Sequence, residues 1–332
     1  MQSHTVPRKL LEQFAFDDQI TRSMRLWKYE KGRPPSPKAS PRSATRFEGH
    51  FADPGNRNKE VELENRLNRQ IEEPVNAFID TIRYATFVLT SSHIRKLARY
   101  ITLLFTRSRA RREATKYQRN LMLGSMNSLL SNPAQLEAVA AKFMKVALAH
   151  GQQPLTKDEV TDGIRKLIEA HNADDQLQRN YVESVEVMLV REDDDLLFGH
   201  WGVLRTGPED PFVIGDAPVV TWERAARNRL MFGQGFGRPN VEVLVPVCPT
   251  ECIHVLPQVE RTRSVLSPAT LEVNMAQASF ATRNCFTNVR SLTLDASLQE
   301  HFGRTRLGEN AFTLGHIDYT NKLFDILMNQ PG

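Results

Sequence analysis

Acidic side chains of the types that hydrolytic sites use are spread along this 332-residue sequence, and one of them closes an apolar run. The run PFVIGDAPVV presents a single acid, Asp216, after Gly215 and before Pro218. Glycine and proline interrupt a strand ladder, so the pattern predicts a buried strand that stops to expose one carboxylate. The alternative is a turn aspartate that hydrogen-bonds its own backbone.

Two glutamates fall on one side of a predicted helix. Apolar residues recur every four positions after Lys59, which predicts a long amphipathic helix with a kink at Pro74. Glu64 and Glu72 are eight residues apart, so they lie within roughly 80° of one another around the helix axis. They are expected to reach one edge of the apolar face, although two solvated glutamates would show the same spacing.

Three further polar residues belong to segments that the apolar pattern places in the fold. His4 directly precedes a short helix predicted in VPRKLLEQF, which can hold it inside the fold. Arg107 belongs to a helix predicted over residues 92–119, and Asn274 to one predicted over residues 267–284. Burying such groups unpaired is costly, and convergence in one pocket would satisfy them. The candidate catalytic residues are therefore His4, Glu64, Glu72, Arg107, Asp216 and Asn274.

Carboxylates with a histidine are ligands that suit Mg²⁺ or Mn²⁺. We take Glu64, Glu72 and Asp216 as candidate ligands of such an ion, which would activate water, with Arg107 stabilising charge on a phosphate. This hypothesis is a metal-dependent phosphodiester hydrolase, nuclease-like, of the kind used as an effector in bacterial conflict. The competing interpretation is structural: Glu72 and Arg107 form an interhelical ion pair, Asp216 caps a turn and His4 is a satisfied surface group.

A second functional hypothesis uses the basic helix predicted over residues 92–119. Its arginines would dock a nucleic acid or an acidic partner without any catalysis; they are Arg95, Arg99, Arg109, Arg111 and Arg112. The alternative is that these side chains extend into water beside a core helix. A third hypothesis is a helical scaffold that has no active site.

The composition narrows the class of protein. A net charge of +4 and a pI near 9.0 permit nucleic-acid binding without requiring it. The three cysteines, Cys248, Cys252 and Cys285, have no framework spacing, which favours reduced thiols, and CPTECIH lacks the fourth ligand of a zinc site. The glycines of GQGFGRPN open no helix, so no nucleotide cofactor is expected. Without a signal-peptide core or an apolar run of about 18 residues, we expect a cytoplasmic protein that has no membrane contact. The oligomeric state stays open.

The order of the segments predicts a mostly helical α+β fold. Residues 59–190 read as helices, and residues 196–290 read as a strand-rich region. An early strand at residues 24–29 is expected to pair with the late strands in one small, mainly antiparallel sheet. Such pairing favours a single interwoven domain over residues 1–332.

Six segments, in their order and spacing, resemble the domain-of-unknown-function 4238 family. They are HTVPRKLLEQF, LWKYEKG with its proline loop, LENRLNRQIEEPV, ARYITLLFTRSRARRE, HWGVLRT followed by FVIGDAPVV, and VLVPVCPTECIHVLP with the helix after it. The resemblance implies a mostly helical α+β protein of unestablished chemistry. Gly215 stands where serine is common in that family, and Ala217 where asparagine is common. The resemblance therefore extends to Asp216 but not to polar neighbours beside it.

Overall fold

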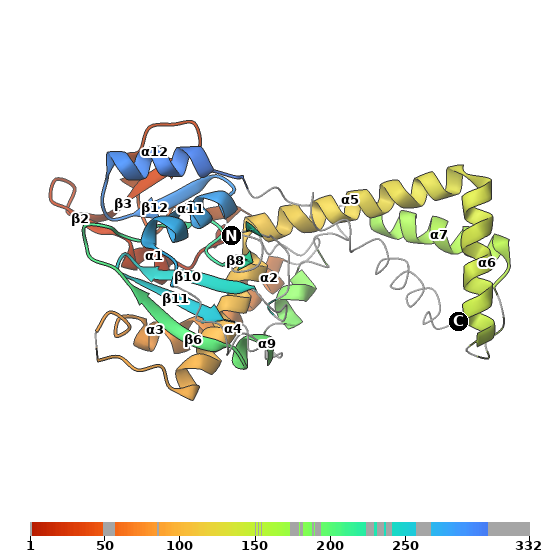
Figure 1. The fold of residues 1–332 in the computed structure, drawn as a ribbon, viewed down its shortest axis with the longest axis horizontal. Coiled ribbons are helices and arrows are strands. Elements are labelled where there is room, and N and C mark those ends of the chain that lie inside the picture. The colour runs from red at the N-terminus through yellow and green to blue at the C-terminus, as the bar shows by residue number, and fades with distance from the viewer. Residues whose placement is uncertain are drawn as a thin grey trace. The chain divides into compact units, whose positions relative to one another are not determined.

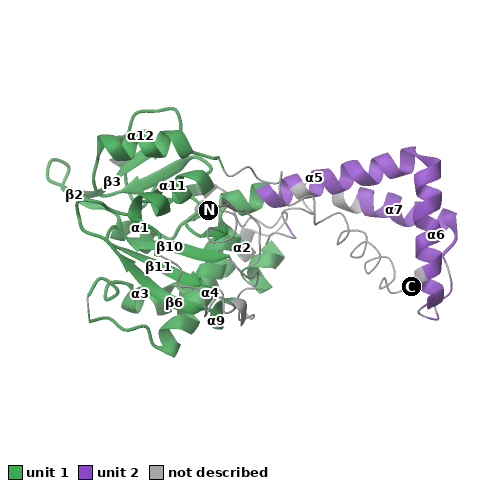
Figure 2. Cartoon of the chain, viewed as in Figure 1, with its two compact units in different colours: residues 1–113, 181–307 green, residues 114–180, 308–332 purple. Residues whose placement is uncertain are grey.

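The computed structural model describes most of the chain as two compact units. The described residues are 2–48, 57–84, 86–149, 155–172, 194–223, 241–256 and 267–304, with 151, 153, 179, 182–187, 189, 229–230 and 236 between them. Unit 1 comprises residues 1–113 and 181–307, and unit 2 comprises residues 114–180 and 308–332 (Figure 2). That residues 1–332 form one domain stays a prediction.

Unit 1 contains two antiparallel sheets (Figure 1). In the first sheet the strand order is β6 (His200–Arg205), β11 (Glu251–Leu256), β10 (Glu242–Cys248), β8 (Val220–Glu223) and β9 (Arg229–Leu230). In the second it is β2 (Phe16–Asp18), β3 (Ser23–Glu30), β12 (Asn284–Thr287) and β7 (Ile214–Gly215), with β4 (Ser36–Ala39) also paired to β3. A separate ribbon joins β1 (Gln2–His4) to β5 (Arg46–Glu48). The mostly helical α+β class with antiparallel strands is confirmed.

The early strand pairs with a late one, but in a sheet of its own. Glu30 of β3 lies opposite Asn284 of β12, which also pairs with β7. The prediction that the early strand at residues 24–29 joins the strands between 196 and 256 in one small sheet was therefore wrong. The helix predicted over 267–284 is the shorter α11 (Thr270–Phe280), because Ala281 adopts an extended conformation that ends it and frees β12 for pairing.

The described helices of unit 1 pack against both sheets. They include α1 (Arg8–Gln13), α2 (Arg57–Leu67), the π-helix η1 (Asn68–Glu72), α3 (Glu73–Ile79), α4 (Ser91–Arg107), α9 (Asp194–Leu197), α11 and α12 (Leu292–His301). The stripe of Leu63, Leu67 and Ile71 is buried in the main core, as the four-residue spacing predicts. Pro74 has no N–H to donate, and the wider turn of η1 lies directly before it.

The helix predicted over residues 92–119 is broken at Ser108. This residue has ψ 144°, so α4 ends there and α5 (Arg109–Ser131) begins directly after it. The Ser108 hydroxyl donates to the carbonyl of Phe105 at 2.9 Å and accepts from the N–H of Arg111 at 3.1 Å. One serine therefore satisfies backbone groups on both sides of the break, as a helix cap does.

Unit 2 is a small helical unit built from most of α5, α6 (Pro133–Ala149) and α7 (Lys157–Asn172). Its core includes Phe143, Val160 and Ile164. Thr156 and Glu159 form reciprocal hydrogen bonds at the start of α7, which confirms the capping box that the sequence TKDE indicates. Among the helices that the structure describes, none is long and apolar enough to cross a membrane.

Candidate functional site

The residues predicted to form one site separate into a buried cluster and a structural turn. In the cluster, Arg107 of α4 pairs with the carboxylate of Glu72 at the end of η1 and donates to the backbone carbonyl of His4 in β1. The Arg107 side chain is only 1% exposed. The guanidinium thus joins three elements that are far apart in sequence, and its charge is neutralised where water does not reach it.

Burial and the arginine set the protonation of the groups around this ion pair. Burial, followed by the charge of Arg107, lowers the pKa of His4 to about 4, so its imidazole is neutral at pH 7. Burial, followed by the charge of Glu72, raises the pKa of Tyr100. In the described part of the chain, neither His4 Nδ1 nor the Tyr100 hydroxyl has a hydrogen-bond partner. The cluster is suited to holding the core together, since little of it faces solvent.

Asp216 does not belong to this cluster. Its carboxylate accepts hydrogen bonds from the N–H groups of Thr282, Arg283 and Asn284 at 2.7, 2.9 and 3.1 Å, and from the Thr282 hydroxyl at 2.9 Å. Burial raises the pKa of this carboxyl, while the four donors oppose that effect. Asp216 thus caps a turn, as the structural interpretation has it, but this turn joins α11 to β12, so the side chain does not bond its own local backbone.

Asn274 of α11 binds the backbone of residues 211–213, shortly before Asp216. Its amide accepts from the N–H of Val213 at 2.8 Å and donates to the carbonyl of Pro211 at 2.9 Å. Gln277, one turn further along α11, bonds Gly215 N–H and the Pro218 carbonyl at 2.9 Å each. A Cβ atom at Gly215 would lie 3.1 Å from the Gln277 carbonyl oxygen, which explains glycine at this close approach. Both amides are thus occupied by backbone groups.

The predicted ligands of a divalent ion are not brought together. Glu72 is paired with Arg107, Asp216 is surrounded by N–H and hydroxyl donors, and Glu64 lies half-buried on α2. Across the described residues, no three His, Cys, Asp or Glu side chains form a group that could hold a metal ion. These acids do not converge because packing between distant segments gave Glu72 and Asp216 other partners. The spacing of residues along a helix does not reveal such partners.

The predicted basic helix presents no continuous row of arginines. Arg95 is exposed on α4, but Nη2 of Arg99 donates to the carbonyl of Leu189 at 2.8 Å. Beyond the break at Ser108, Arg109 pairs with Glu113 at 2.7 Å. The Arg111 guanidinium lies over the ring of Phe105 at 5.6 Å, and Arg112 is half-buried. Most of these side chains therefore have a structural contact already.

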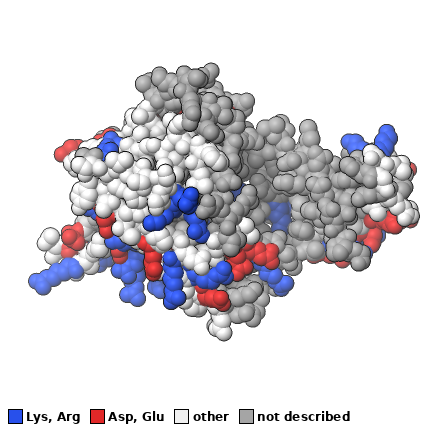
Figure 3. Space-filling model, turned by 90° about the horizontal axis from the view of Figure 1, so that it is seen from below, with Lys and Arg blue, Asp and Glu red and all other residues white. Residues whose placement is uncertain are grey.

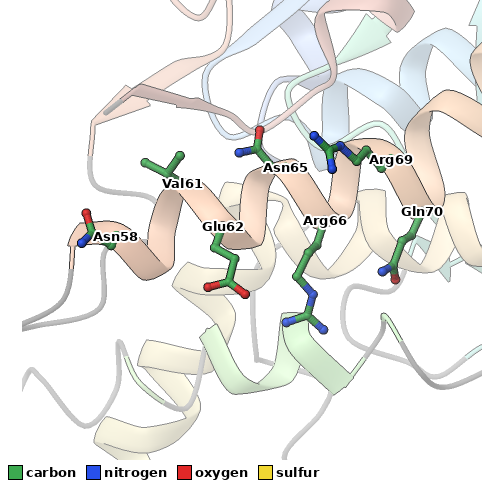
Figure 4. A pocket seen from close by; sticks show the side chains of 7 residues that line it. All are labelled: Asn58, Val61, Glu62, Asn65, Arg66, Arg69 and Gln70. Atoms are coloured by element: carbon green, nitrogen blue, oxygen red, sulfur yellow. The ribbon is translucent and has the colours of Figure 1, made fainter.

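An open groove along α2 and η1 combines two cations with polar neighbours. Its volume is about 500 Å³, and its described lining residues are Asn58, Val61, Glu62, Asn65, Arg66, Arg69 and Gln70 (Figure 4). The spacing of these residues follows one exposed face of the helix. The buried stripe of Leu63, Leu67 and Ile71 holds the opposite face in the core. Sequence reasoning missed this site, although the polar residues between the apolar positions were its signal.

The arginines of the groove have no structural contact that would account for them. Within the described chain, Arg66 and Arg69 form no hydrogen bond or ion pair, whereas Arg83, Arg99, Arg107 and Arg109 each do. The face of the molecule in Figure 3 shows basic side chains interspersed with acidic ones, not one broad basic patch. On that face the positive charge is therefore divided among several places.

A buried acid–histidine pair was also missed. Nε2 of His254 in β11 lies 2.8 Å from Oε2 of Glu242 in β10, and their side chains are 7% and 1% exposed. Both residues stand in apolar strand sequences, where an isolated polar residue indicates a partner on a neighbouring strand.

Cys248, which precedes the turn between these strands, donates a hydrogen bond from its thiol to Glu251, and burial raises the pKa of this thiol to about 11. A thiol with that pKa is not a poised nucleophile.

The structure is that of an α+β protein with two antiparallel sheets and a buried ion pair between Glu72 and Arg107. An open groove lies on the exposed face of α2 and η1. The family model described as "Protein of unknown function (DUF4238)" matches residues 2–291, and the chain belongs to that family. No curated protein and no solved structure matches the chain.

Proposed function

We propose that the protein binds the phosphate groups of a nucleic acid in the groove along α2 and η1. The observation that carries the proposal is the pair Arg66 and Arg69, which lines the groove without any other partner in the described chain. A guanidinium presents a planar set of N–H donors that matches two phosphate oxygens at once. The net charge of +4 favours the approach of a polyanion.

This proposal places the binding function on α2 and not on the helix region 95–119. Each of the five arginines there already has a hydrogen bond, an ion pair, an aromatic contact or another interaction within the protein. Hydrolysis with Mg²⁺ or Mn²⁺ has less support, because both acids already have partners. Glu72 neutralises Arg107, and Asp216 accepts hydrogen bonds from backbone N–H groups. Hydrolysis therefore enters only as an outcome of the test.

The test is fluorescence anisotropy of a labelled oligonucleotide, titrated with the full chain at several salt concentrations. In Arg66→Gln/Arg69→Gln the affinity should fall about tenfold or more at low salt. The slope of log K against log salt should become shallower by about 1 to 2. The variant lacks two phosphate contacts, so its binding releases fewer counterions. Arg33→Gln/Arg42→Gln removes the same charge from two exposed arginines outside the groove and should keep most of the affinity.

Equal losses in both double variants would show that only net charge matters, and unchanged binding in the groove variant would overturn the proposal. The same oligonucleotide is incubated with Mg²⁺ or Mn²⁺ and run on a denaturing gel. Cleavage that a chelator abolishes, and that the purified groove variant retains, would favour the hydrolase hypothesis over a binding protein.

A further inference from the structure

The lining of the groove contains more than positive charge. Its side chains form two rows at four-residue spacing: Val61, Asn65 and Arg69 on one side of the helix, and Glu62, Arg66 and Gln70 on the other (Figure 4). Each row therefore combines one arginine with one amide. A surface that only attracted phosphate would not need the amides, because a carboxamide carries no charge.

Of the three amides in the described lining, Asn65 and Gln70 are available to a ligand, whereas Asn58 has another interaction. In the described part of the chain, Asn65 and Gln70 make no hydrogen bond, and both are exposed. A carboxamide offers two N–H donors and one carbonyl acceptor, so it matches a group that presents a donor beside an acceptor. Asn274 and Gln277 show the contrast, since each donates to one backbone group and accepts from another.

We infer that the groove holds an unpaired nucleotide, with Arg66 and Arg69 on its phosphate groups and Asn65 or Gln70 on the edge of its base. The inference rests on the proposed function and narrows its ligand to single-stranded nucleic acid. Asn and Gln pair with the N6 and N7 groups of adenine through two hydrogen bonds, so adenine is the preferred base. The acid Glu62 adds an acceptor for an exocyclic amino group.

The size of the site favours a single nucleotide over a duplex. The described side chains line an open groove of about 500 Å³, within the roughly 300–1,000 Å³ of pockets that bind small ligands. A duplex needs a larger site, because specific protein–DNA interfaces bury roughly 1,000–2,500 Å² of protein surface. A single strand turns its bases outward and delivers one to a hollow site.

The described lining contains no aromatic residue. Stacking, which binds every base with similar strength, therefore contributes little in the described groove. Within the described lining, discrimination between bases rests on hydrogen bonds, and we expect it to disappear when Asn65 and Gln70 are removed. The contributions of the amides and the arginines can therefore be measured separately, because contacts with phosphate do not depend on the base.

The experiment compares labelled 12-nucleotide oligomers of dA, dT and dC, and the dA·dT duplex, by anisotropy at one moderate salt concentration. The wild-type chain should bind dA about tenfold more tightly than dT or the duplex. In Asn65→Ala/Gln70→Ala the preference should fall to within about twofold while the salt slope stays unchanged. The matched control Asn120→Ala/Asn127→Ala removes two exposed amides on α5, outside the groove, and should keep the preference.

The outcomes separate this inference from the proposed function. Salt-dependent binding that needs Arg66 and Arg69 but treats all bases and the duplex alike would overturn the base contact and leave phosphate binding intact. Preference for the duplex would overturn the unpaired nucleotide. Binding that does not depend on the arginines overturns both. Circular dichroism and thermal melting of each variant establish that the chain is folded, which is expected because all substituted side chains lie on exposed or half-exposed helix positions.

Discussion

The inner and outer sides of the segment formed by α2 and η1 use charge in opposite ways. On the inner side, Glu72 neutralises Arg107, whose side chain is 1% exposed. On the outer side, Arg66 and Arg69 have no partner within the described residues, although they belong to the same helical segment. A charge removed from water needs a partner, whereas an exposed charge does not. The buried pair is therefore accounted for by the fold, whereas the two arginines of the groove remain available to a ligand.

The largest expected effect is on the inner side. Glu72→Ala leaves the Arg107 guanidinium buried without its carboxylate, so the free energy of unfolding should fall by about 3–5 kcal/mol. Glu72→Leu/Arg107→Met removes both charges and should recover part of that loss. Urea denaturation of the wild type, Glu72→Leu, Arg107→Met and the double variant measures the coupling. A loss below about 1 kcal/mol in Glu72→Ala would contradict the structural role of this pair.

The next effect concerns Asp216, the other acid that serves the fold. Asp216→Asn replaces one acceptor oxygen by an NH₂ group facing N–H donors, and should lower the free energy of unfolding by about 2 kcal/mol. Affinity for an oligonucleotide should not change at a temperature where the variant is folded. Loss of affinity without loss of stability would place Asp216 in the binding site and weaken the contrast between inner and outer charges.

His4 gives a smaller effect that depends on pH. Its pKa is lowered to about 4 in the folded state from an ordinary 6.5, so the unfolded chain takes up the proton first as the pH falls. The stabilisation is complete above pH 6.5 and is lost between pH 6.5 and pH 4. His4→Gln should therefore flatten the decline in stability over this range, measured by urea denaturation at pH 7, 5.5 and 4.5. Parallel curves for the two proteins would show that His4 is not desolvated.

The smallest effect tests the outer side directly. Glu62 lines the groove beside the two arginines and repels an anion. Glu62→Gln should raise oligonucleotide affinity about twofold to threefold at low salt, and the gain should shrink at high salt because the charges are exposed. Glu137→Gln, on an exposed glutamate of α6, removes the same charge outside the groove and should have less effect. Equal gains from both would reduce the groove to a net-charge effect.

Local sequence patterns predicted much of the fold but little of the site. The four-residue spacing of Leu63, Leu67 and Ile71 gave the buried side of α2, and TKDE gave the cap at Thr156. The break at Ser108 was missed because the apolar and basic pattern continues across it. The ion pair of Glu72 with Arg107 was one of two interpretations, and only the structure separated them.

The sequence by itself determined which residues turn inward and which turn outward, because a helix repeats every 3.6 residues whatever surrounds it. Only the tertiary structure decided which polar groups meet. Asp216 bonds to N–H groups 66 to 68 residues further along the chain, and Glu72 to an arginine 35 residues away. Such partners are chosen by the packing of whole elements, since a buried carboxylate is stable only where that packing delivers a donor. For the same reason, Arg66 of α2 and Arg69 of η1 became a candidate site only when the groove beside them was known.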